Sequence, residues 1–179
     1  WSLWDYSAIT LANKDDKVYF YGENPNGFSS SSLKRSQFTT TGTLGVSGNV
    51  MTLITRDGSV TAIPSSFCFY KLFNENSSIT SAPLLPATTL ASYCYYQMFY
   101  NCTSLTTPPV LPATTLADFC YRNMFSGTSL TIAPELPATT LTDSCYAAMF
   151  SRCSRLVLAP ELPATSLYYR CYNNMFDGC

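Results

Sequence analysis

The feature that most constrains this chain is a phrase that recurs at almost equal intervals. Leu-Pro-Ala-Thr begins at residues 85, 111, 136 and 162, which gives a period of 25 to 26 residues. A weaker copy stands upstream, because Cys68 to Phe73 lies 26 residues before Cys94 to Phe99. Such a unit cannot bury its apolar face alone and must stack on its neighbours. The sequence therefore predicts about five stacked coils.

A short strand is predicted in each unit. Residues 105–111 (LTTPPVL) are apolar, brief and bounded by Pro, and residues 130–136 and 156–162 are their counterparts. A short helix is predicted next, because Thr115 and Asp118 have the spacing of a helix N-terminal cap.

The predicted helix runs through the Cys-Tyr-x-x-Met-Phe segment. Leu116, Cys120 and Met124 are four residues apart and would share one helix face that points into the coil. Asn101, Gly127 and Gly178 suit the left-handed residue that ends such a helix. The fold class predicted is an α+β repeat solenoid of leucine-rich-repeat type, with one short strand and one short helix per coil.

Like residues are expected to stack on like through the coils. The predicted interior ladder consists of Leu90, Leu116, Leu141, Leu167, Cys94, Cys120, Cys145, Cys171, Met98, Met124, Met149, Met175, Phe99, Phe125, Phe150 and Phe176. A tyrosine column is predicted on the convex side, formed by Tyr95, Tyr121, Tyr146 and Tyr172. That column would either stack between coils or offer a platform for sugar rings.

The repeat can be written Cys-x-x-Leu-x-x-x-Pro-x-Leu-Pro-x-x-x-Leu-x-x-x-Cys-Tyr-x-x-Met-Phe-x-x-Cys. Over residues 60–179 it resembles the BspA-like leucine-rich repeat family of bacterial surface proteins, and most closely its gut Bacteroidales type. The resemblance implies a secreted or surface-exposed protein. Two departures stand out: residues 126–130 delete the second Cys, and the chain stops in mid-coil at Cys179, so we expect the natural protein to continue.

Residues 1–60 lack the repeat and are predicted to form a separate small β module. Short apolar bursts at residues 8–11, 17–21, 43–46 and 49–54 are typical of strands, and turn-rich stretches separate them. This module would cover the open edge of the first coil. The predicted domains are therefore a β cap at 1–60 and a repeat region at 61–179.

Charge and hydropathy exclude several partners. Charged residues make up 12% of the chain and the net charge is -1, with no basic cluster beyond Lys34-Arg35, so nucleic acid is not expected. No run of 18 apolar residues exists, so a membrane-spanning segment is not expected. A first residue of Trp rather than Met suggests a processed or trimmed chain, so the lack of a leader is no argument for the cytoplasm.

The chain contains no histidine, which removes the usual general base, the usual partner of a nucleophile and the commonest metal ligand. Two carboxylate pairs occupy equivalent positions in neighbouring coils, Glu135 with Glu161 and Asp118 with Asp143. Such pairs could serve a glycosidase or bind calcium, but solvated surface carboxylates are the favoured interpretation. No enzyme activity and no cofactor are predicted.

Eight cysteines allow disulfide, metal or free-thiol interpretations. Cys94 with Cys102, and the two later pairs of the same kind, lack the close spacing of zinc sites, so no metal is predicted. Intra-coil disulfides would leave Cys68 and Cys120 without mates. Buried free thiols are favoured over disulfides, although an oxidising exterior weakens that preference.

Positions that differ between coils are the predicted contact residues, since solenoids vary a binding surface on a constant framework. The residues predicted to line a concave binding face are Thr107, Ile132, Leu158, Val110, Glu135 and Glu161. The predicted function is adhesion or recognition of a protein or glycan partner at a bacterial surface. Two alternatives remain at this point: a structural spacer in a larger assembly, and a glycan-binding appendage of an extracellular enzyme.

Overall fold

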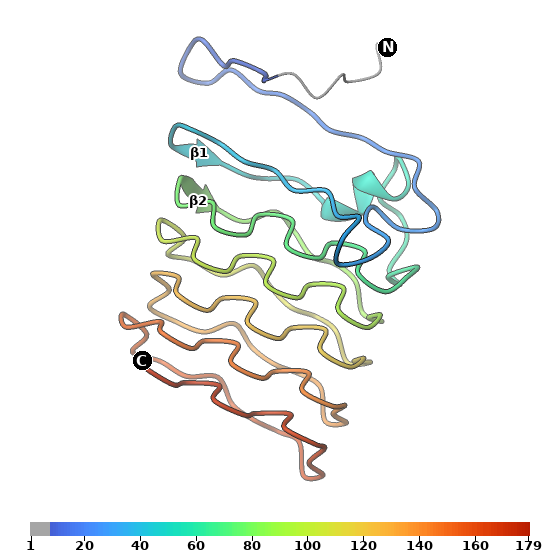
Figure 1. Ribbon diagram of the computed structural model, residues 1–179, viewed down its shortest axis with the longest axis vertical. Helices are drawn as coiled ribbons and strands as arrows, with labels where there is room; N and C mark the ends of the chain where they lie inside the picture. Colours follow the sequence, from blue (N-terminus) through green and yellow to red (C-terminus); the bar gives the residue numbers. More distant parts are fainter. Residues whose placement is uncertain (1–7) are drawn as a thin grey trace.

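The repeats form coils that lie one beneath another, as Figure 1 shows for the green to red part of the chain. A computed structural model describes residues 8–179. Backbone hydrogen bonds join each coil to the one that follows: the Tyr95 N–H donates to the Cys120 carbonyl, and the Tyr121 N–H donates to the Cys145 carbonyl, each at 3.0 Å. The coils are therefore held in register along the whole stack.

The predicted α+β solenoid class is wrong. Residues 8–179 contain no α-helix, and their only strands are β1 (Leu44–Gly45) and β2 (Ile79–Ser81), which pair in parallel. A 3-10 helix, η1, spans Val50–Leu53. The strands predicted at 105–111, 130–136 and 156–162 are not formed. The segments 130–136 and 156–162 are paired through an isolated bridge between Ile132 and Leu158.

Consecutive β-turns take the place of the predicted helix. Tyr93, Gln97 and Asn101 have φ of 59°, 52° and 54°, so every fourth residue is left-handed, as the third residue of a type II turn is. Cys94 and Met98 donate their N–H groups three residues back, to Ala91 and Tyr95, at 3.2 and 3.1 Å.

The remaining N–H groups of this segment turn toward the neighbouring coil. Tyr93 and Gln97 donate to the carbonyls of Asp118 and Arg122, both at 3.0 Å. A helix would satisfy all of these groups within itself and leave none to join the coils. The stack therefore gains its inter-coil hydrogen bonds by forming turns in place of a helix.

The four-residue turn explains the sequence pattern that predicted a helix. Side chains point inward in adjacent pairs, such as Cys94 with Tyr95, and then outward in pairs, such as Tyr96 with Gln97. An inward residue therefore recurs at intervals of four, which is also the spacing of one helix face. The left-handed positions predicted at Asn101, Gly127 and Gly178 are present, with φ of 54°, 72° and 74°, but they end turns.

Most of the predicted ladder residues lie in the core. The Leu, Cys, Met and Phe positions of the ladder are at most 8% exposed, with two differences in the last coil: Leu167 is 67% exposed and Phe176 is half-buried. In the described residues no further coil lies over these two. The phenylalanine rings stack from Phe73 through Phe99 to Phe125, with centroids 5.6 and 5.7 Å apart.

The tyrosine column lies in the core, not on the convex surface as predicted. Tyr95, Tyr121 and Tyr146 are each 1% exposed, and successive rings stack at 5.8 and 5.7 Å. Phe69 extends the column at one end and the half-buried Tyr172 at the other. Because the turn directs two adjacent side chains inward, both Cys and Tyr of each Cys-Tyr pair are buried. These rings therefore offer no platform for a sugar.

The segment before the repeats lies against the first coil. Ser29 and Phe38 donate their N–H groups to the carbonyls of Cys68 and Leu72, at 2.9 and 2.8 Å. The ring of Phe38 also stacks on Phe73 with centroids 5.8 Å apart, which lengthens the phenylalanine column.

Most of the strands predicted in this segment are absent. No strand forms at residues 8–11, 17–21 or 49–54, and Leu44–Gly45 is the part of 43–46 that does. The domain boundary at residue 60 stays a prediction.

Candidate recognition surface

One face of the stack exposes the residues that vary most between coils. In the coil that begins near Cys102, the side chains of Thr106, Thr107 and Val110 are exposed, while Leu105 and Leu111 are buried. The same alternation of buried and exposed positions recurs in the coils on either side. We call the exposed positions at 80–84, 106–110, 131–135 and 157–161 the variable face.

The structure places all six predicted contact residues on the variable face. Val110, Ile132 and Leu158 are 75%, 52% and 58% exposed, and Thr107, Glu135 and Glu161 are exposed as well. They form two columns, in which Ile132 pairs with Leu158 through a parallel bridge. The sequence alone did not decide which of them point outward, and their role in binding stays a prediction.

Sequence reasoning missed Leu84, which stands one coil before Val110 and is 63% exposed. Together with Leu85, Pro86 and Pro112, these two residues line an open groove of about 220 Å³. The signal was present in the sequence, because Leu84 precedes Leu-Pro-Ala-Thr as Val110, Glu135 and Glu161 do.

The two predicted carboxylate pairs have different surroundings. Asp118 accepts a hydrogen bond from the Asp143 N–H at 3.1 Å, so it helps to hold two coils together. Glu135 and Glu161 are exposed on the variable face. Within residues 8–179 no cluster of three or more Cys, Asp and Glu side chains has an arrangement that would hold a metal ion.

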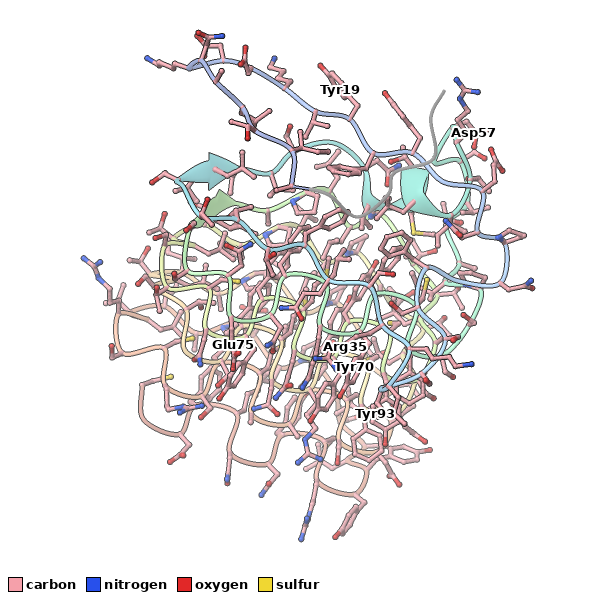
Figure 2. The ribbon with its side chains drawn as sticks, turned by 45° about the horizontal axis from the view of Figure 1, so that its top comes forward. Tyr19, Arg35, Asp57, Tyr70, Glu75 and Tyr93 are labelled. Carbon is pink, nitrogen blue, oxygen red and sulfur yellow. The ribbon has the colours of Figure 1, made fainter. Side chains whose placement is uncertain are left out.

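A group of half-buried aromatic residues lies along the turns of the first coils. Tyr93 is stacked between Phe67 and Phe119, with centroids 4.8 and 4.6 Å apart, so both faces of its ring are covered. Figure 2 shows Arg35 and Tyr70 close to Tyr93. Burial raises the pKa of Tyr70, and the neighbouring Tyr96 adds to the effect. These aromatic residues mainly join neighbouring coils, because their ring faces are covered by stacking on one another.

The loops before the repeats line a half-open cavity of about 790 Å³, which is larger than the groove. Its lining residues are Asn24, Phe28, Leu33, Arg35, Ser36, Gln37 and Phe38. All four polar side chains of this lining donate hydrogen bonds to backbone carbonyls. Asn24 donates to Leu53 and Gln37 donates to Asn74, each at 2.6 Å, while Arg35 donates to Ser32 at 3.2 Å and Ser36 donates to Phe28 at 3.4 Å. Arg35 is the one charged residue in the lining among residues 8–179.

All eight cysteines belong to the described part of the chain, and all are free. Burial raises the pKa of Cys68 to about 11 and that of Cys102 to about 12. The thiol of Cys102 donates to the Phe73 carbonyl of the preceding coil at 3.1 Å. Because the thiolate is the reactive species, these buried thiols serve as packing groups and not as nucleophiles.

Comparison with known proteins adds no relative: no family model, curated protein or solved structure matches this chain. Among residues 8–179 no helix is long and apolar enough to cross a membrane.

Proposed function

We propose that this chain is a non-enzymatic recognition module, exported by a bacterium and related to the BspA-like family. It would hold a protein or glycan partner against the variable face. The observation that carries this proposal is the exposure of large apolar side chains in the middle of the stack, at Leu84, Val110 and Ile132.

The contrast between the core and the variable face supports a binding role. The interior Cys, Met and Phe positions are nearly identical from coil to coil, whereas the position of Thr107 becomes Ile132 and then Leu158. Packing accounts for the constant positions. It does not account for exposed isoleucine and leucine, since groups of exposed apolar residues mark interaction sites.

The buried thiols are compatible with the proposed extracellular location. Oxidation proceeds through the thiolate, and the raised pKa of Cys68 and Cys102 keeps their thiolate fractions very small at neutral pH. Free cysteines can therefore persist in an oxidising environment while the stack stays folded. The resemblance of the repeat to surface proteins supports the same location.

A binding array of host-matrix proteins and glycans tests the proposal, using the 1–179 chain and a Thr107→Lys, Ile132→Lys, Leu158→Lys triple variant. A matched control carries Thr114→Lys, Thr139→Lys and Thr165→Lys, which are also exposed but lie in another column. We expect a partner that the first variant loses and the control retains, with unchanged melting temperatures. If no partner binds, or if both variants bind equally well, the proposal fails and a spacer role is favoured.

A further inference from the structure

One column of the variable face is aliphatic in two coils and acidic in the next two. Leu84, Val110, Glu135 and Glu161 occupy the same place in four successive coils. In the first three of these four coils, the column residue stands between a buried Pro and a buried Leu, so its own side chain must point outward. The column therefore presents two aliphatic side chains followed by two carboxylates.

The aliphatic half of this column borders the groove of about 220 Å³. Leu85, Pro86 and Pro112 complete its lining, and the exposed lining is almost entirely apolar. Leu84 and Val110 remain 63% and 75% exposed there. The groove can accept an aliphatic side chain, and covering these residues would remove apolar surface from water.

The acidic half of the column lacks a cation of its own. Neither Glu135 nor Glu161 has a salt bridge or a side-chain hydrogen bond to another described residue, and both are exposed. A bridge and backbone hydrogen bonds join residues 131–133 to residues 157–158, and backbones paired in this way lie about 4.8 Å apart. Two carboxylates one coil apart therefore repel each other across a short distance. A Lys or Arg side chain placed between them would relieve this repulsion, which makes the site complementary to a positive charge.

The distance between the apolar groove and the glutamate pair determines how far apart the two matching groups of a ligand must be. The middle of the groove and the middle of the glutamate pair are two coils apart. Because backbone hydrogen bonds join each coil to the next, and backbones joined in this way lie about 4.8 Å apart, two coils correspond to about 10 Å. A polyproline II peptide returns its side chains to the same side every three residues and rises about 9 Å over that interval.

We infer that the partner of the variable face is a protein with an extended segment that carries an aliphatic residue and, three residues away, a lysine or arginine. The aliphatic side chain lies in the groove beside Leu84 and Val110, and the cation lies between Glu135 and Glu161. This inference rests on the proposed function and narrows its partner to a basic peptide segment.

Fluorescently labelled peptides test the inference against the intact chain by fluorescence anisotropy. The probes are Gly-Ser-Leu-Pro-Pro-Lys-Ser-Gly and its mirror order, Gly-Ser-Lys-Pro-Pro-Leu-Ser-Gly, since either chain direction satisfies the spacing. Comparison peptides replace Leu by Ser, replace Lys by Glu, or remove one Pro. We expect the parent peptide in one order to bind at least threefold more tightly than all three comparison peptides, and to bind more weakly as salt is raised.

Matched protein variants assign the two halves of the site. Glu135→Gln with Glu161→Gln should weaken binding three- to tenfold and reduce its salt dependence. Leu84→Thr with Val110→Thr should weaken binding while the salt dependence remains. Glu75→Gln, an exposed carboxylate on the turn side, should change neither.

Two results would overturn the inference. One is that no parent peptide binds better than its comparison peptides, and the other is that the double glutamine variant binds as wild type does. If the array experiment nevertheless finds a partner that the triple lysine variant loses, the proposed recognition role stands and only the assignment of a basic peptide is refuted.

Discussion

The hydroxyl of Thr128 lies 3.3 Å from the thiol of Cys153 in the next coil. Thr128 also donates to the Phe125 carbonyl at 2.8 Å and is 4% exposed. It therefore occupies the interior place that Cys102 fills one coil earlier. The coil that contains residues 126–130 therefore retains a buried polar group at this place. The apparent loss of its second cysteine is a replacement by threonine.

Replacing Thr128 by valine should lower the free energy of unfolding by about 1 kcal/mol, because the buried hydrogen bond to Phe125 is lost. Thr128→Cys should cost less, since a thiol fills the equivalent place at Cys102 and Cys153. Urea unfolding followed by circular dichroism measures both variants. A cysteine variant that is less stable than the valine variant would contradict the assigned equivalence.

Tyr95→Phe and Tyr146→Phe should each raise the free energy of unfolding by about 1 kcal/mol, because the hydroxyls of both residues are buried with no hydrogen-bond partner among residues 8–179. Phenylalanine already occupies this column at Phe69, where it stacks on Tyr95. Tyr172→Phe serves as the control, since Tyr172 is half-buried and should change little. Chemical denaturation decides the point, and a loss of stability in both core variants would refute it.

Leu116→Asp should destabilise the fold by about 4 kcal/mol or more, because Leu116 is 8% exposed and a carboxylate there would be buried without a partner. Leu167→Asp is the matched variant, at the same position of the last coil but 67% exposed, and should cost little. Thermal melting compares the two. Equal melting temperatures would show that Leu116 does not lie in the core.

Ala148→Gly should stabilise the chain by about 1 kcal/mol. Ala148 has a φ of 52°, and the left-handed region costs free energy for an L-residue but not for glycine. The neighbouring Ala147 is 4% exposed and does not have a positive φ, so Ala147→Gly should be destabilising. Opposite signs in urea unfolding support the turn ladder. A helix at this position would make both glycines destabilising.

Stability should be constant from about pH 6 to 8 and should fall as the pH rises above 9. Burial raises the pKa of Cys68 from 9.0 to about 11 and that of Cys102 to about 12, so the folded state favours the neutral thiols. Their contribution is complete below the unfolded pKa and is lost as the pH rises toward the folded value.

Urea unfolding between pH 6 and 11 measures this dependence. Cys68→Ala should reduce the alkaline loss, although it lowers the stability at pH 7 by removing packing. A stability that is independent of pH up to 11 would mean that the thiols are accessible to water in the folded chain.

The choice between helix and turn could not be made from the sequence of one coil. Cys120 and Met124 are four residues apart, and both structures place such residues on one side. The turn ladder directs half of its N–H groups to another coil, as from Phe99 to Met124 at 3.0 Å. Its advantage therefore depends on a neighbour some 25 residues away, and intrinsic preferences of the segment do not include that neighbour.

The sequence by itself determined the period and most of the stacked core, because identical apolar residues at equal intervals can be buried only against their own copies. It also located the positions that vary, from Thr107 to Leu158. Only the tertiary structure decided that Tyr121 points inward, that Thr128 replaces a cysteine and that Leu84 borders a groove. The direction of each side chain depends on the left-handed turns, and these are stabilised by hydrogen bonds between coils.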